Sequence, residues 1–155
     1  FDEAKAFIST LYWKLDGIED NVFAIMKNNK TGLVASLHST MTQWRHLFSL
    51  EVFMESGYMV LNGLRTSSQT YGEEVLTIAR NRTKAPAATW EDEERFVFDV
   101  DTSMDQEVQL FKDAITSGKN PSSGNSDDAR NVMMLVDAIY ENSIDTQNGT
   151  RSSLI

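Results

Sequence analysis

Apolar and polar residues alternate along most of the first hundred positions, which is the period of a β-strand with two different faces. In the run EAKAFISTLYW at 3–13, Ala4 and Ala6 fall on one face, while Phe7 and Leu11 fall on the other. Similar runs recur along the chain, and they predict six or seven strands. The strand-like runs lie at 3–13, 21–28, 33–42, 47–54, 58–65, 69–80 and 96–100.

Two short segments have the composition of hairpin turns. NNKTG at 28–32 and ESG at 55–57 contain Asn or Gly, which tolerate the positive φ that tight turns demand. A hairpin joins neighbouring strands in antiparallel orientation. We therefore expect a mostly antiparallel, open sheet of about six strands in the first two-thirds of the chain.

The apolar period becomes helical at residue 103. Ser103 and Gln106 form a capping-box pattern, and Gly118 and Pro121 end this first helix. After the loop NPSSGN, a second helix is expected to be capped by Ser126 and to bury a broad apolar stripe. That stripe consists of Ala129, Val132, Met133, Val136, Ile139 and Tyr140.

This order of elements predicts an α+β fold with the C-terminal helices packed on one face of the sheet. Two helices are too few to cover both faces of six strands, yet the second face also carries apolar residues such as Phe7, Phe23 and Ile25. That face needs a cover, either upstream sequence or another subunit, so we expect a homo-oligomer formed through it. We expect residues 1–143 to form one domain, and the polar, aperiodic residues 144–155 to form a disordered tail.

Composition narrows the class of protein. The 155 residues carry a net charge of −9 without clustered Lys and Arg, which argues against a nucleic-acid partner. The acidic run WEDEER at 90–95 is typical of a solvated face. The chain has no cysteine and no apolar run near the ~20 residues of a membrane helix. These features favour a soluble, cytoplasmic protein with no membrane partner, and the first residue, Phe1, favours a piece of something longer.

Common catalytic and cofactor motifs do not occur in the sequence. It has no G-x-G-x-x-G, no G-x-x-x-x-G-K-[ST], no H-E-x-x-H, no D-x-D-x-D-G and no G-x-S-x-G. The two histidines, His38 and His46, are eight residues apart, a poor spacing for two metal ligands on one strand. The sequence therefore indicates no catalytic, cofactor-binding or metal-binding residue in this chain.

Both histidines lie in the stretch HSTMTQWRHLFSLEV at 38–52. His38 alternates with Ser36 and Thr40, which indicates a hydrogen-bonded position on the polar side of its strand. Trp44, Arg45 and His46 follow where that strand ends. Aromatic and guanidinium groups at a strand end suit the binding of a polar ring, and they suit equally a loop that covers the core.

Two long segments resemble the C-terminal domain of the Gfo/Idh/MocA oxidoreductases, the glucose–fructose oxidoreductase and inositol dehydrogenase family. With the sequence that lies between the two segments, the likeness extends over most of the chain. Residues 18–64 resemble its pattern of an acidic-Asn start, a strand, "N-G-x-x-A-x-L-H-x-S", a short loop and "F-x-x-E-[IV]-x-x-x-x-G", with Thr31 and Thr40 in place of the pattern's Asn and Ser. Residues 105–143 resemble its closing helix, its "G-x-x-P" loop and a final helix ending in "A-I-Y-x-S".

The resemblance implies a longer enzyme, in which an N-terminal Rossmann domain binds NAD or NADP and this domain holds a sugar or polyol and mediates oligomerisation. The family's lysine in its E-K-P context and its G-G-x-x-x-D-x-x-x-H helix belong outside this part, and neither motif occurs here. The fragment alone is therefore expected to be inactive. Its expected partners are its own Rossmann domain, further copies of itself and the substrate.

In the family, the loop after the "L-H-x-S" strand contacts the substrate. The matching positions here are Gln43, Trp44, Arg45 and His46, which we take as candidate substrate-binding residues. An Arg at this place could pair with a carboxylate or with a nucleotide-sugar phosphate, and the sequence leaves both open. A different function also stays open, that of a stand-alone, non-catalytic interaction module that uses the same sheet to associate.

Overall fold

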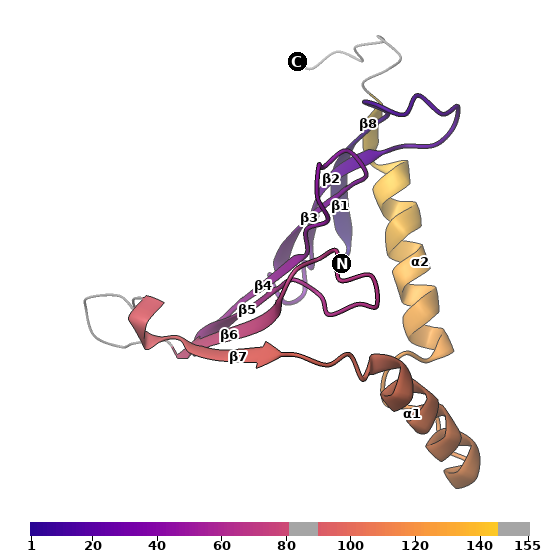
Figure 1. Cartoon of the computed structure of the whole chain (residues 1–155). Helices are drawn as coiled ribbons and strands as arrows, with labels where there is room; N and C mark the ends of the chain where they lie inside the picture. Colours follow the sequence, from indigo (N-terminus) through magenta and orange to yellow (C-terminus); the bar gives the residue numbers. More distant parts are fainter. Residues whose placement is uncertain (81–89, 146–155) are drawn as a thin grey trace. The chain divides into compact units, whose positions relative to one another are not determined.

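The computed structural model describes residues 1–80 and 90–145, which form a mixed α+β structure (Figure 1). The chain divides into two compact units, Phe1–Thr42 with Gly118–Ile155, and Gln43–Ser117. The strands form two four-stranded sheets, with the order β3-β2-β1-β8 in one and β4-β5-β6-β7 in the other. The expected α+β class is confirmed, whereas the expected single sheet of about six strands is wrong.

The first sheet consists of β1 (Glu3–Ser9), β2 (Asn21–Lys27), β3 (Val34–Thr40) and β8 (Ser143–Asp145). The hairpin predicted at NNKTG is confirmed, since β2 pairs antiparallel with β3. β8 adds a parallel strand beside β1. The first two residues of the expected tail, at 144 and 145, therefore belong to a strand, and the remainder of that tail lies outside the described residues.

One face of the first sheet packs against α2 (Ser126–Glu141), which runs beside β1 (Figure 1). Small side chains line the centre of this face, because Ala6 and Ala24 are cross-strand partners and are 1% and 3% exposed. They leave room for Ile139 to approach the sheet. The buried core of this unit is Ala4, Ala6, Ala24, Met26 and Ile139.

The apolar stripe of α2 is only partly buried. Its C-terminal half contacts the sheet through Ile139 and Leu135, whereas Val132 and Met133 remain exposed. The prediction that Met133 is a core residue is wrong. The N-cap of α2 is Asn125, one residue before the expected cap Ser126. Asn125 accepts hydrogen bonds from the backbone N–H groups of Asp127 and Asp128 and forms a capping box with Asp128.

The opposite face of the first sheet is not covered by the described part of its own unit. Four side chains form a row across it, because Ile144 on β8 and Phe23 on β2 both pair with Phe7 on β1, and His38 on β3 pairs with Phe23. Phe7, Phe23 and Ile144 are each about half exposed. The sequence prediction of a second apolar face is confirmed for β1 and β2.

The second sheet consists of β4 (Ser49–Met54), β5 (Gly57–Asn62), β6 (Glu74–Arg80) and β7 (Glu94–Phe98), all antiparallel. The hairpin expected at ESG is confirmed as the β4–β5 turn. A short 3-10 helix, η1 (Trp90–Asp92), precedes β7. One face carries a row of apolar residues, one from each strand: Leu50, Leu61, Leu76 and Phe96.

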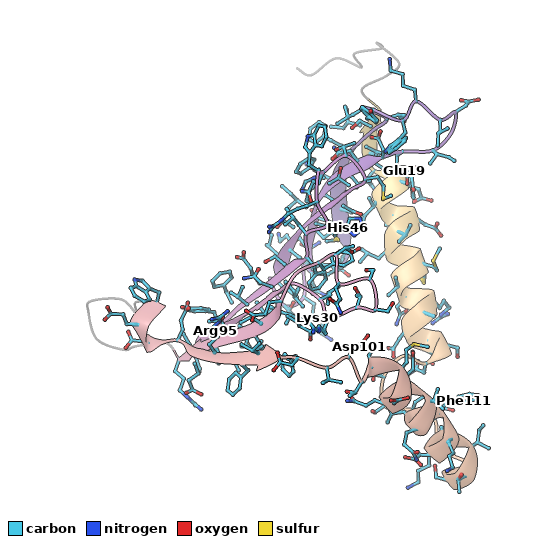
Figure 2. All side chains as sticks on the ribbon, in the orientation of Figure 1. Glu19, Lys30, His46, Arg95, Asp101 and Phe111 are labelled. Carbon is cyan, nitrogen blue, oxygen red and sulfur yellow. The ribbon has the colours of Figure 1, made fainter. Side chains whose placement is uncertain are left out.

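The first of the two predicted helices, α1 (Ser103–Ser117), is present but buries none of its side chains. Its apolar positions, including Phe111, project from the helix and remain exposed (Figure 2). The prediction of helices packed on a sheet face is therefore confirmed for α2 and not for α1. At its N-terminus, the Asp101 carboxylate accepts hydrogen bonds from the backbone N–H and the hydroxyl of Ser103.

The first predicted strand ends four residues early, at Ser9. The cause is Asp20, a buried residue whose carboxylate accepts hydrogen bonds from the backbone N–H groups of Leu11, Tyr12 and Trp13 at 2.8, 2.8 and 3.0 Å. These N–H groups are turned toward one carboxylate, so they cannot extend a strand ladder. The hydrogen bond from Leu11 contributes most to holding the pKa of Asp20 below its ordinary value of 3.8, against the opposing effect of burial.

We expect Asp20→Asn to lower the stability of the chain at neutral pH and to lose this effect in acid. A depressed pKa in the folded state means that the carboxylate contributes its full stability above about pH 4, and loses it as the pH falls through the folded-state pKa. The measurement is urea unfolding of both proteins at pH 7 and near pH 3. The control is Asp16→Asn, an exposed carboxylate of the same loop, and a stability difference as large at pH 3 as at pH 7 would contradict the prediction.

Candidate functional site

The four candidate substrate-binding residues lie in the exposed connection between β3 and β4. Trp44 is fully exposed, and Gln43, Arg45 and His46 are exposed as well. Within residues 1–80 and 90–145, the side chains of Trp44 and Arg45 make no hydrogen bond or ion pair. Neither residue covers a core in the unit to which it belongs. These two positions therefore do not support the alternative that the turn is a loop covering the core.

His46 is the one residue of this turn whose side chain is fixed by neighbours. Its Nδ1 lies 2.7 Å from the Thr70 hydroxyl oxygen, and its ring centroid lies 4.9 Å from that of Tyr71 (the position of His46 is labelled in Figure 2). The structure therefore joins His46 to the loop between β5 and β6, residues 63–73. It leaves Gln43, Trp44 and Arg45 without such a link.

The loop at 63–73 is a feature that the sequence prediction missed. Three of its hydroxyl groups form a hydrogen-bonded line, with 3.0 Å between the side-chain oxygens of Thr66 and Ser68 and 3.0 Å between those of Ser68 and Thr70. The signal that could have revealed it is the spacing T-x-S-x-T at 66–70, which places hydroxyls at every second position.

His38 lies on the uncovered face of the first sheet. Its ring stacks on Phe23 with 3.9 Å between centroids, and its Nε2 lies 3.3 Å from the amide oxygen of Asn21. The interpretation of His38 as a hydrogen-bonded surface histidine is confirmed. The two histidines belong to different units of the chain.

One tyrosine–glutamate pair in each unit holds a loop of that unit. The Tyr58 hydroxyl donates to Glu93 at 2.7 Å, and the Tyr140 hydroxyl donates to Glu19. In both pairs the hydrogen bond to the carboxylate raises the pKa of the tyrosine above its ordinary value of 10.0, so both tyrosines are neutral at physiological pH. Within the acidic run at 90–95, Glu93 bonds Tyr58 and Arg95 forms an ion pair with Glu73 at 2.8 Å.

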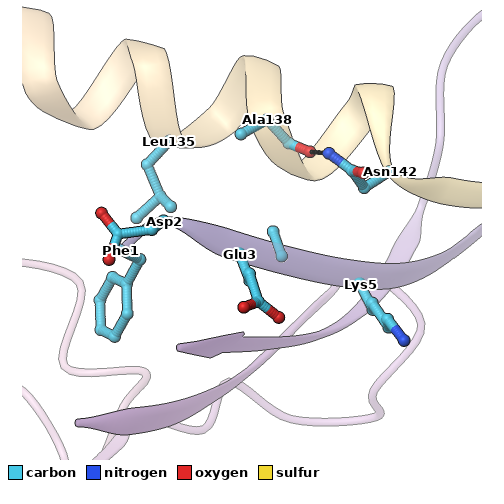
Figure 3. Close-up of a pocket in the computed structure, with 8 residues that line it drawn as sticks. Phe1, Asp2, Glu3, Lys5, Leu135, Ala138 and Asn142 are labelled. Atoms are coloured by element: carbon cyan, nitrogen blue, oxygen red, sulfur yellow. Dashed lines mark hydrogen bonds between the residues drawn. The ribbon is translucent and has the colours of Figure 1, made fainter. Parts of the chain in front are cut away.

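A hollow of about 300 Å³ lies between the start of β1 and α2 (Figure 3). Part of its polar lining is already engaged, because the Glu3 carboxylate accepts a hydrogen bond from the Asn29 side chain at 2.6 Å and Asn142 donates to the Ala138 carbonyl at 2.9 Å. The rest of the lining includes the apolar side chains of Phe1 and Leu135. This hollow offers no convergent set of polar groups for a ligand.

The described residues meet neither the requirements of a metal site nor those of a membrane-spanning helix. No group of three or more His, Asp or Glu side chains there is arranged to hold a metal ion. No helix in the described ranges is long and apolar enough to cross a membrane. The chemistry offered by the turn at 43–46 and the loop at 63–73 is hydrogen bonding by hydroxyl and imidazole groups beside aromatic rings.

No protein-family model matches the sequence, and no curated protein matches it.

Proposed function

We propose that this chain is the substrate-binding and oligomerisation domain of an NAD(P)-dependent oxidoreductase that acts on a CH–OH group of a sugar or cyclitol. The observation that carries the proposal is the turn at 43–46. It follows β3, the strand at the place of the family's "L-H-x-S" strand, and presents an exposed tryptophan, arginine and histidine, of which His46 contacts the hydroxyl-rich loop at 63–73. Such a surface suits a ligand rich in hydroxyls, since hydroxyl and imidazole groups both donate and accept hydrogen bonds.

The order of elements supports the proposal. The family-like segments lie on two strands and a helix, with Leu37 and His38 of the "L-H-x-S" pattern on β3, where Thr40 stands in place of the pattern's Ser, with Glu51 and Val52 of "F-x-x-E-[IV]" on β4, and with "A-I-Y" in the last turn of α2. Antiparallel hairpins precede the two helices along the chain. No single motif is unique, so this support comes from the order in which the family-like segments follow one another along the chain.

The nicotinamide cofactor does not fit this chain. A dinucleotide site of the Rossmann type needs a glycine-rich turn between a strand and a helix, and the sequence has no G-x-G-x-x-G. The proposal therefore assigns NAD or NADP binding, together with the lysine and the Asp/His pair of the family pattern, to a preceding Rossmann domain. This chain contributes the residues that bind the substrate.

The proposal includes a homo-oligomer formed through the uncovered face of the first sheet. Phe7 is 55% exposed and Phe23 49% exposed, and Ile25 on the same face is 63% exposed. Soluble proteins rarely leave contiguous apolar surface of this kind open to water, because its burial against a partner is favourable. A second copy offers the same face and satisfies two-fold symmetry.

The proposal is tested by nicotinamide turnover. We expect the protein encoded together with its upstream reading frame to oxidise sugars or polyols with NAD or NADP, and the 155-residue chain alone to show no turnover. Turnover by the 155-residue chain alone would contradict the proposal. A start codon immediately upstream of Phe1, with no G-x-G-x-x-G in the preceding reading frame, would favour the stand-alone interaction module instead.

A further inference from the structure

The hydroxyl line of the loop at 63–73 ends on a histidine ring. Its links run from Thr66 to Ser68 at 3.0 Å, from Ser68 to Thr70 at 3.0 Å, and from Thr70 to Nδ1 of His46 at 2.7 Å. These residues are at most partly buried, so their remaining hydrogen-bonding capacity faces solvent. Each hydroxyl is one donor and two acceptors, and one contact per side leaves capacity for a ligand.

Two hydrogen bonds donated by backbone N–H groups hold this loop in place. The Gly63 N–H donates to the Phe48 carbonyl at 2.9 Å, and the Arg65 N–H donates to the Glu74 carboxylate at 2.6 Å. Phe48 lies only two residues after His46, so the first of these bonds ties the loop to the turn. The hydroxyl line and the imidazole are therefore held together before any ligand arrives, which lowers the entropic cost of binding.

The His46 ring is held on two sides and open on the third. Thr70 occupies Nδ1, and Tyr71 lies against the ring with 4.9 Å between centroids. Within the described residues, Nε2 of His46 makes no hydrogen bond. The Thr70 hydroxyl can donate to Nδ1 or accept from it, so the direction of this hydrogen bond is coupled to the tautomer: Nε2 carries the proton when Thr70 donates, and Nε2 is an acceptor when Thr70 accepts.

We propose that Thr66, Ser68 and Thr70 complete a binding surface for the hydroxyl groups of a sugar or polyol, and that Thr70 is a positioning residue that fixes the His46 imidazole with Nε2 toward the ligand. This inference rests on the proposed function and adds to it a second segment, distant in sequence from the turn at 43–46.

The surface favours a neutral ligand over an anionic one. The carboxylates nearest in sequence are already used, Glu73 by Arg95 and Glu74 by the Arg65 N–H. The line itself consists of three uncharged hydroxyls, and the chain as a whole carries a charge of −9. The net charge opposes phosphate as the ligand, whereas Arg45 of the turn and Arg65 of the loop are the cations through which phosphate would bind, so phosphate is one arm of the test.

The test is imidazole NMR of the 155-residue chain, which has only two histidines. His38→Gln assigns the His46 signals. We expect one predominant His46 tautomer in the wild type, a tautomer mixture in Thr70→Val, and restoration by Thr70→Ser. Addition of D-glucose or D-sorbitol should shift the signals of His46 and of the 66–71 amides, and Thr70→Val should weaken this binding about tenfold, the loss expected for one hydrogen bond.

The matched control is Thr102→Val, which replaces an exposed threonine of the same unit outside the loop. It should leave the His46 signals and the titrations with D-glucose and D-sorbitol unchanged. A His46 spectrum that Thr70→Val leaves unaltered overturns the inference. So does a titration in which inorganic phosphate, and neither carbohydrate, shifts the loop.

The inference and the proposed function fail separately. If the longer protein turns over NAD or NADP but Thr70→Val leaves its KM unchanged, the inference is wrong and the proposed function stands. If the longer protein shows no turnover, but carbohydrate still shifts the NMR signals of His46 and Thr70→Val weakens that binding, the proposed function is wrong and the binding surface stands.

Discussion

Replacing Gly63 by alanine is expected to disrupt the second sheet. Gly63 is buried just after β5 with a φ of +72°, and a Cβ built there would lie 2.1 Å from the Glu73 carbonyl oxygen and 2.8 Å from its carbon. Both atoms are backbone, so the chain itself must move. We expect a loss of at least about 4 kcal/mol in the free energy of unfolding, the range of severe backbone and packing lesions.

The sequence supplies a matched control in Gly32→Ala. Gly32 has nearly the same φ, +75°, but nothing within 4 Å of its would-be Cβ. This substitution should cost only the strain of a left-handed alanine, about 1 kcal/mol. Denaturant unfolding followed by circular dichroism measures both losses. Equal losses in the two variants would mean that the close approach of residues 63 and 73 is not a feature of the folded chain.

Gly63→Ala also connects stability to the site. Because residue 73 ends the loop that carries Thr66, Ser68 and Thr70, a shift of its backbone moves the hydroxyl line away from His46. In Gly63→Ala, the His46 imidazole should lose its predominant tautomer even at temperatures where part of the chain remains folded. Gly32→Ala, which lies in the other unit, should leave the His46 signals unchanged.

The double substitution Phe7→Thr with Phe23→Thr is expected to convert a self-associating chain into a monomer. The two phenylalanines are cross-strand partners at the centre of the uncovered face, and both are about half exposed. Threonine retains strand propensity while it removes most of the apolar surface. If these rings are central anchors of an interface, the dissociation constant should rise at least about a hundredfold.

Sedimentation of the wild type and the variant at high micromolar concentration measures this change, with circular dichroism to verify the fold. The control is Tyr12→Thr, which removes a more exposed aromatic ring that lies in the loop after β1, outside the strands. A wild type that sediments as a monomer would contradict the proposed homo-oligomer. Equal dissociation in the double variant and Tyr12→Thr would locate the interface elsewhere.

The sequence predicted one part of the candidate site, the turn at 43–46, but not the loop that the turn contacts. The turn at 43–46 stands out because its tryptophan, arginine and histidine are adjacent, and its position after β3 was expected. Its link to Thr70 was missed, because a hydrogen bond between residues 24 positions apart depends on where the β5–β6 loop closes. Hydroxyl residues at alternate positions are also common in ordinary loops, so their spacing alone does not point to a ligand.

Local chemistry determined much of this fold. The turns at NNKTG and ESG, the stop of the first helix at Gly118 and the alternation in β1 and β2 all follow from the conformational preferences of neighbouring residues. Features of this kind depend on interactions within a few positions, so the sequence by itself determined the hairpins, the two helices and the α+β class.

The tertiary structure decided what joins distant positions. It divided the strands into two sheets of four, added residues 143–145 beside β1, ended β1 early through the Asp20 carboxylate and placed Thr70 against His46. Each of these contacts links segments whose local patterns are compatible with several partners. The choice among partners is made by simultaneous packing and hydrogen bonding in three dimensions, which no period along the chain encodes.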